Sequence, residues 1–213
     1  MNSVNVNGVS VFKGLIQRAE QAKMLDELRE LAKAAPFRRY QTPSGQMSVR
    51  MSGAGAQSWF ADPSGYRYEP RQPDGQSWPD IPNSVLAVWQ QVAGVAQQPD
   101  SCLVNFYGEN AKMGMHQDKD EASLDWPVVS ISLGDEALFR VGQTTRRGAT
   151  QSIWLQSGDI AVLSGEARLA YHGIDRIKFG SSALLPDGGR INVTLRVAGS
   201  SSSLEGEDSP PEE

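Results

Sequence analysis

The second half of the chain, from residue 101 onward, most constrains the fold, because it consists of short apolar or alternating runs separated by Gly-containing turns. The runs read CLVNFY, PVVSISL, ALFRV, SIWLQ, DIAVLS and RINVTLRV. Runs of this length and spacing are typical of antiparallel strands in a sandwich or barrel. A chain of 213 residues can bury a full core as one domain. The sequence therefore predicts a single, mainly β domain.

Two amphipathic helices are expected before these strands. The first covers residues 16–34 and stops before Pro36, and the second follows Pro82 with an apolar stripe formed by Val85, Trp89, Val92 and Ala96. Both helices are expected to cover one sheet. Residues 37–80, between the helices, are rich in Gly, Pro, Ser, Arg and Tyr. This composition predicts short strands and long loops, which often carry function.

Charge is distributed unevenly along the chain. Five of the 25 Asp and Glu residues lie in the last ten residues, so residues 1–203 carry 20 acids against 20 bases. We expect residues 200–213 to form an acidic, disordered tail. The net charge of -5 therefore says little about the surface of the domain.

Cellular context is indicated by what the sequence lacks. Cys102 is the single cysteine, which excludes an internal disulfide and a Cys-based metal site and fits a reducing compartment. The first residues show no basic segment followed by an apolar run, and no stretch of 18 apolar residues occurs. We expect a cytoplasmic protein without a membrane segment.

The stretch MHQDKDE carries the candidate metal ligands His116 and Asp118. In a strand, residues two apart point to the same face, so both side chains could enter a barrel. His172, in LAYHGI, is the second of only two histidines. Two imidazoles and one carboxylate that leave other positions open form the facial triad of non-haem Fe(II) oxygenases. A catalytic zinc with the same ligands, or histidines with a structural role, are the alternatives.

The run RINVTLR predicts a polar face opposite an apolar one. Alternation places four polar residues on one face of this strand: Arg190, Asn192, Thr194 and Arg196. Inward-facing arginines require an anion, because an unmatched buried charge is costly. A dicarboxylate that chelates the metal at one end and meets arginine at the other would satisfy both features. The alternative is an edge strand whose arginines face solvent.

A second strand, in CLVNFY, would bring Asn105 and Tyr107 to the same cavity by the same alternation. Ordinary hydrogen bonding inside a barrel is the alternative role for either residue.

With these motifs assembled, the chain resembles the AlkB family of Fe(II)- and 2-oxoglutarate-dependent dioxygenases, in particular its bacterial nucleic-acid demethylases. The resemblance runs from about residue 35 to residue 199 and depends on four segments: NFY with HQDKDE, PVVSISLG, SGDIAVLSGEARLAYHGI and RINVTLR. It implies a double-stranded β-helix, or jelly roll, with flanking N-terminal helices. One domain would span residues 1–199, with a nucleotide-recognition lid at about 37–80 and the catalytic jelly roll at about 101–199.

The resemblance also implies roles for individual residues. The metal ligands would be His116, Asp118 and His172, which form the catalytic group together with Arg196. The contacts to 2-oxoglutarate would be Asn105, Tyr107, Arg190, Asn192 and Arg196. We expect Arg196 at the distal carboxylate and Arg190 at the iron-bound end.

The substrate contacts implied by the resemblance are Trp59, Tyr66, Asp120 and Arg146. Trp59 would stack on the flipped base and Asp120 would face its exocyclic amine, whereas a core position is the alternative for Trp59. The chain departs from the family at Leu163, where relatives have an aromatic residue near the iron, and in the loop VGQTTRRGATQS. These departures leave the preference among lesions open.

The implied activity is oxidative demethylation of bases such as 1-methyladenine and 3-methylcytosine, with Fe(II) as cofactor and 2-oxoglutarate and dioxygen as cosubstrates. Succinate and formaldehyde would be products. Single-stranded DNA is the favoured partner, because flipping a base costs least there, and RNA is a second candidate. We expect a monomer whose clustered arginines contact phosphates: Arg38, Arg39, Arg67, Arg71, Arg146 and Arg147. The alternatives are an oxygenase acting on a protein or a small molecule, and a non-catalytic jelly-roll binding protein.

Overall fold

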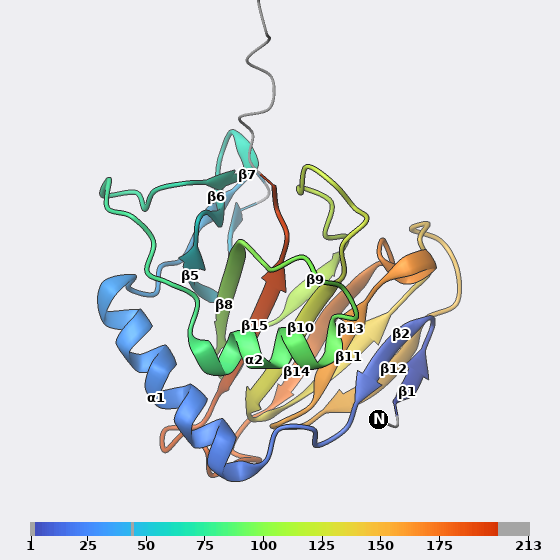
Figure 1. The fold of residues 1–213 in the computed structure, drawn as a ribbon. Coiled ribbons are helices and arrows are strands. Elements are labelled where there is room, and N and C mark those ends of the chain that lie inside the picture. Colours follow the sequence, from blue (N-terminus) through green and yellow to red (C-terminus); the bar gives the residue numbers. More distant parts are fainter. Residues whose placement is uncertain (1–2, 44, 200–213) are drawn as a thin grey trace, which may run out of the picture.

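Two antiparallel sheets lie face to face in the computed structural model, which describes residues 3–43 and 45–199 (Figure 1). The larger sheet has the strand order β1-β2-β13-β10-β15-β8-β5, with bounds Val4–Val6, Val9–Phe12, Ile160–Leu163, Val128–Gly134, Arg190–Arg196, Ser101–Tyr107 and Arg50–Gly55. The smaller sheet has the order β12-β11-β14-β9, with bounds Gln151–Leu155, Glu136–Val141, His172–Lys178 and Met113–His116. The mainly β jelly roll is confirmed. The expected tail lies outside the described residues.

Two helices cover the outer face of the larger sheet, as expected. These are α1 (Arg18–Ala34) and α2 (Asn83–Val92) (Figure 1). Leu28 of α1 and Trp89 of α2 belong to one buried cluster with alternate residues of the sheet, including Val193 of β15. The second helix is shorter than the apolar stripe suggested, because it ends at Val92.

Alternation along β15 divides its side chains between two cores, as the sequence predicted. Ile191, Val193 and Leu195 pack against the helices. The polar residues between them face the space between the sheets and line a cavity there: Arg190, Asn192, Thr194 and Arg196. Neighbouring β8 follows the same rule, and the register places Asn105 opposite Asn192 and Tyr107 opposite Arg190. The arginines are therefore buried, and the edge-strand alternative is wrong.

The region between the helices forms two small ribbons and one strand of the larger sheet. The ribbons are β3 (Gln41–Thr42) with β4 (Gly45–Gln46), and β6 (Ser58–Asp62) with β7 (Gly65–Glu69). Residues 50–55 pair with β8 instead. The larger sheet thus extends beyond residues 101–199.

The N-terminal hairpin β1–β2 was not expected, although the sequence contains its signal. Asn7 and Gly8 connect the strands with φ angles of 46° and 87°. An Asn-Gly pair with two positive φ angles is typical of a tight hairpin turn. The hairpin adds an edge to the larger sheet through the pairing of β2 with β13.

A close approach of β9 and β14 brings the two histidines together. His116 and His172 are register partners, and the pairing becomes irregular immediately after His172. A Cβ atom on Gly173 would lie 2.6 Å from the Met113 carbonyl oxygen and 2.9 Å from that of Gly114. Glycine at position 173 therefore permits the close approach of β9 and β14, which brings the two imidazole rings next to each other.

No helix within the described part of the chain is long and apolar enough to cross a bilayer.

Candidate metal and cosubstrate site

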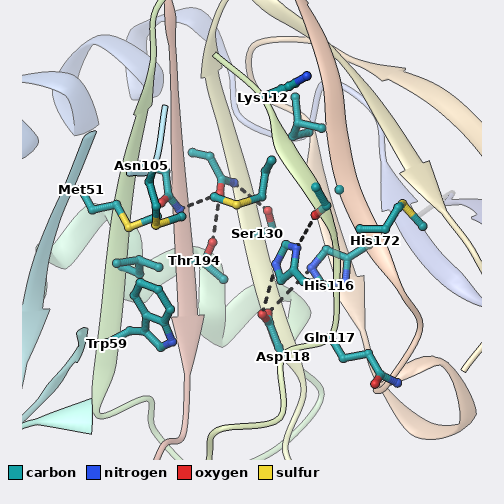
Figure 2. Close-up of a pocket in the computed structure, with 18 of the residues that line it drawn as sticks. Met51, Trp59, Asn105, Lys112, His116, Gln117, Asp118, Ser130, His172 and Thr194 are labelled. Atoms are coloured by element: carbon teal, nitrogen blue, oxygen red, sulfur yellow. Dashed lines mark hydrogen bonds and ion pairs between the residues drawn. The ribbon is translucent and has the colours of Figure 1, made fainter. Parts of the chain in front are cut away.

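The three predicted ligands converge in one place. Ligand atoms of His116, Asp118 and His172 all lie within 4.8 Å of one another (Figure 2). Asp118 Oδ1 is 3.6 Å from His116 Nε2, and Asp118 Oδ2 is 3.9 Å from His172 Nε2. Asp118 lies two residues beyond the end of β9, so alternation within a strand does not explain its direction. Contacts of the carboxylate itself must hold it in place.

Both imidazoles present Nε2 to the shared space. The Nδ1 atoms lie 2.9 Å from the Gly114 carbonyl oxygen for His116 and 3.0 Å from the Ala170 carbonyl oxygen for His172. An Nδ1–H donated to a carbonyl leaves Nε2 as the free lone pair that a metal requires. Burial, followed by the neighbouring His116, lowers the pKa of His172 to about 4. His172 is therefore neutral near pH 7, which is the ligating form.

Asp118 is held by Arg196. Its Oδ2 accepts a hydrogen bond of 2.7 Å from Arg196 Nη2, and both side chains are buried. Burial alone would raise the pKa of Asp118, but Arg196, His172 and His116 outweigh burial and hold that pKa below its ordinary value. The carboxylate is thus ionised at neutral pH, as a metal ligand must be.

Arg190 lies at the other end of β15 and has no charged partner in the described part of the chain. Its Nη2 donates to Ser132 Oγ at 2.9 Å, whereas Nε and Nη1 are buried without a hydrogen-bond partner among the described residues. Burial lowers the pKa of Arg190 to about 10, against the opposing effects of Tyr107 and Asp159. Two unsatisfied donors on a buried cation form a site that an anion would complete.

The two arginines of β15 lie at different depths of the cavity. Arg196 contacts Asp118 and therefore lies at the metal end. Arg190 is six residues away on the same strand, which corresponds to roughly 20 Å of extended chain. Alternation along the strand fixes the face on which each arginine lies but not its depth in the cavity. The contacts favour Arg190 for the role at the distal carboxylate.

A cavity of about 640 Å³ joins these groups. All twelve predicted site residues line it: Trp59, Tyr66, Asn105, Tyr107, His116, Asp118, Asp120, Arg146, His172, Arg190, Asn192 and Arg196. Asn105 donates to Asn192 Oδ1 at 3.3 Å, and the Asn105 Oδ1 atom is buried without a partner in the described structure. Figure 2 shows Thr194 and Ser130 between Trp59 and the triad, with Asn105 beside Met51. The cavity wall is thus polar where the strands are central to the sheet.

Aromatic side chains form the rim of this cavity. The rings of Trp59 and Tyr66 are stacked, with centroids 5.5 Å apart and an interplanar angle of 19°. Trp59 Nε1 donates to Asp120 Oδ2 at 3.0 Å, and Tyr66 is 49% exposed. Trp59 is only partly buried, so it is not a residue of the deep core. Arg146 is exposed beside the same opening.

The predicted arginine cluster is less cationic than its sequence suggests. Arg67 forms ion pairs with Asp62 and Glu69, and Arg38 pairs with Asp74. These partners neutralise two of the six proposed phosphate contacts. Sequence reasoning also gave no role to Tyr68, Glu121 and Arg168. Tyr68 and Arg168 both contact Glu121, which in turn lies beside Arg196. Charge and position in the sequence gave no signal that this acid and this base are buried together.

Comparison with known families agrees with the fold and the site. The sequence model of the 2OG-Fe(II) oxygenase superfamily matches residues 8–196, which include the triad and every strand of both sheets except β1. The fold and the ligand set therefore define a dioxygenase of this class, which requires Fe(II), 2-oxoglutarate and dioxygen.

Individual relatives identify the family within this superfamily. The Alpha-ketoglutarate-dependent dioxygenase AlkB homolog of Caulobacter vibrioides is 48% identical over 91% of this chain and 89% of that protein. The Alpha-ketoglutarate-dependent dioxygenase AlkB of Escherichia coli is 41% identical over 85% of each chain. The solved structure of OsALKBH1 superposes with a TM-score of 0.76 and 30% identity, covering 92% of this chain and 98% of that one. The chain belongs to the AlkB family of 2OG-Fe(II) oxygenases.

The triad residues should differ in their effect on stability. Asp118→Ala leaves the buried Arg196 with less than its full counter-charge, which should lower the free energy of unfolding by about 3 kcal/mol. His116 is 40% exposed, so His116→Ala should cost less than about 1 kcal/mol. Urea unfolding of the metal-free proteins, with EDTA present, measures both values. Equal losses in the two variants would show that the Asp118–Arg196 contact does not stabilise the fold.

Proposed function

We propose that the protein removes methyl groups oxidatively from N-alkylated bases in nucleic acid, such as 1-methyladenine and 3-methylcytosine. The observation that carries this proposal is that three features line one cavity: the metal triad, the stacked aromatic pair, and Arg190 with two buried donors that lack partners among the described residues. The names of the AlkB relatives, and of the Nucleic acid dioxygenase ALKBH1 of Mus musculus, support it. Succinate, carbon dioxide and formaldehyde are the expected products.

The donor set suits Fe(II). His116, Asp118 and His172 would hold the ion through two imidazole nitrogens and one ionised carboxylate, leaving positions open for ligands. Bound Fe(II), with 2-oxoglutarate and dioxygen, supplies the oxidising power that hydroxylates the N-methyl carbon, which then leaves as formaldehyde. The protein orients the cosubstrate and the base and excludes water from the cavity.

The two arginines divide the recognition of 2-oxoglutarate. Arg190 would bind the distal carboxylate with its unsatisfied Nε and Nη1 donors. Arg196 has one buried donor, Nη1, that lacks a partner among the described residues, and it would act at the metal end. Asn105 and Asn192 are register partners between these ends, whereas Tyr107 is opposite Arg190, and all three line the cavity. Each arginine thus has a buried donor left for one carboxylate of a dicarboxylate.

The rim provides what a flipped base requires. Trp59 offers an aromatic face, Asp120 offers an acceptor for an exocyclic amine, and Tyr66 and Arg146 lie at the opening. The ribbons at residues 41–46 and 58–69 would form the nucleotide-recognition lid, and the described residues would act as one catalytic domain. A base must leave its stack to enter such a cavity. Single-stranded DNA is therefore the proposed preferred substrate, with RNA as the second candidate.

Formaldehyde release from a defined oligonucleotide tests the proposed function. With Fe(II), 2-oxoglutarate and dioxygen present, a single strand carrying one 1-methyladenine should yield one formaldehyde and one normal adenine per lesion. The same lesion in a duplex should react more slowly, because the base must also be unstacked. Succinate formation without any formaldehyde from methylated DNA or RNA would support an oxygenase with another substrate. Lack of both products would exclude an enzyme of this chemistry.

The assignment of Arg190 can be tested without turnover. Arg190→Met should weaken binding of 2-oxoglutarate to the Mn(II)-loaded protein by about 10- to 150-fold, the equivalent of one charge-assisted contact. It should not weaken binding of 2-oxobutyrate, which lacks the distal carboxylate. Calorimetric titration measures both affinities. Arg140→Met, which removes a cation paired with Asp175 away from the cavity, is the matched control.

The ligand 2-oxobutyrate decides which end of the cavity each arginine serves. Arg196→Met should weaken both ligands, because both share the end that binds the metal. If Arg190→Met weakens 2-oxobutyrate as strongly as 2-oxoglutarate, the proposed orientation of the cosubstrate is wrong.

The stacking role of Trp59 gives a selective prediction. Base–aromatic stacking contributes about 1 to 3 kcal/mol, so Trp59→Ala should weaken binding of a methylated oligonucleotide by about 5- to 150-fold. Affinity for 2-oxoglutarate should be unchanged. Trp59→Phe keeps an aromatic face but loses the hydrogen bond to Asp120, so it should retain most of the oligonucleotide affinity. Fluorescence anisotropy measures this series, and equal losses in Trp59→Ala and Trp59→Phe would argue against stacking.

A further inference from the structure

Behind the triad lies a buried group of four charged side chains. Asp118, Glu121, Arg168 and Arg196 are each no more than 8% exposed. Two carboxylates face two guanidinium groups, so the cluster is balanced in charge. Balance matters because an unpaired charge in such a position costs several kcal/mol, as an order of magnitude. Removing one of the four charged side chains therefore leaves the other three with an unbalanced buried charge.

Arg168 makes the most directional contacts in this cluster. Its Nε donates to the Trp126 carbonyl oxygen at 2.7 Å, and its Nη1 donates to the Asp118 carbonyl oxygen at 2.6 Å. Its Nη2 lies 3.3 Å from Glu121 Oε2. One guanidinium group thus holds both ends of the loop formed by residues 118–126 and a side chain within it. The metal carboxylate is at the first position of that loop.

The place of Arg168 in the chain connects both arms of the triad. It follows the short 3-10 helix η1 (Gly165–Ala167) and precedes His172 by four residues. The contact with Asp118 therefore joins the segment that leads into one ligand to the loop that carries another. Neither Arg168 nor Glu121 is among the residues that line the cavity. Any effect on the metal must act through their neighbours.

Glu121, which Arg168 contacts, also contacts Arg196. Glu121 Oε1 is 3.1 Å from Arg196 Nε and accepts a hydrogen bond of 3.0 Å from the hydroxyl of Tyr68. Arg196 Nη2 in turn donates to Asp118. With Nε and Nη2 both engaged, the planar guanidinium has one orientation, and its remaining Nη1 donor is directed by these contacts.

We propose that Arg168 is a positioning residue, which orients Asp118 through its carbonyl group and Arg196 through Glu121. This inference rests on the proposed function, in which Asp118 holds the metal and Arg196 acts beside it. Loss of contacts that hold metal ligands without touching the metal typically lowers metal affinity by about 10- to 100-fold. A purely structural role is the competing explanation, because a buried arginine also joins the loop to the rest of the fold.

Binding of Mn(II) and thermal unfolding together separate the two explanations. Arg168→Met should lower the melting temperature, because it leaves Glu121 with incomplete counter-charge. It should also weaken Mn(II) binding by about 10- to 100-fold. The double variant Arg168→Met/Glu121→Gln restores charge balance, so its melting temperature should recover in part, although the hydrogen bonds to the Trp126 and Asp118 carbonyl groups remain missing. Its Mn(II) affinity should stay low, since the contact with the Asp118 carbonyl is still missing.

A conservative pair of variants keeps the test decisive if Arg168→Met does not fold. Arg168→Lys retains the charge but cannot reach three acceptors in one plane, so Mn(II) affinity should still fall about 10-fold or more. Arg140→Lys is the matched control outside the cluster, and its Mn(II) affinity should equal that of the unaltered protein. Calorimetry or the electron paramagnetic resonance signal of free Mn(II) measures the affinity without turnover.

The outcomes are distinguishable. Recovery of Mn(II) affinity together with melting temperature in the double variant, or unchanged affinity in Arg168→Lys, would overturn the positioning role and leave a structural one. Failure of the unaltered protein to bind Mn(II) would instead contradict the metal site itself. Mn(II) binding with no formaldehyde release would contradict the proposed substrate while leaving the role of Arg168 intact.

Discussion

The buried contact between Arg196 and Asp118 is the interaction on which the site depends. Arg196 is the last residue of β15 in the larger sheet, whereas Asp118 follows β9 of the smaller sheet. The contact therefore joins the two halves of the jelly roll where their polar residues meet. It also holds the Asp118 carboxylate in its ionised form against the cost of burial. Without it, two imidazoles would face each other with no anion between them.

The two inward arginines of β15 show how one strand can serve two chemical tasks. The charge of Arg196 is matched within the protein by ion pairs with Asp118 and Glu121. Arg190 keeps two buried donors without partners in the described structure, which reduces stability unless a ligand completes them. Perturbed, incompletely matched charges of this kind concentrate at functional sites. The difference in their partners, rather than in residue type, assigns the arginines to opposite ends of the cavity.

Sequence periodicity was sufficient to predict which residues face the cavity, but not how deep each one lies. Alternation in RINVTLR and CLVNFY depends only on local strand geometry, and the structure confirms it. The order of Arg190 and Arg196 relative to the metal depends on how the sheets pack, which no local pattern encodes. The same limit applies to Asp118, whose direction comes from a partner 78 residues away. Arg168 and Glu121 were missed because solvated and buried charge pairs look alike in a sequence.

The hairpin β6–β7 is attached to the metal-bearing loop by two contacts that follow from strand pairing. Trp59 and Tyr68 are cross-strand partners. Trp59 donates to Asp120, and Tyr68 donates to the next residue, Glu121. Two adjacent residues of the loop are thus hydrogen-bonded to two cross-strand partners of the hairpin. These contacts fix the position of the aromatic rim relative to the triad. A base that enters beside Trp59 would meet a surface already oriented toward the metal, which lowers the entropic cost of placing its methyl group there.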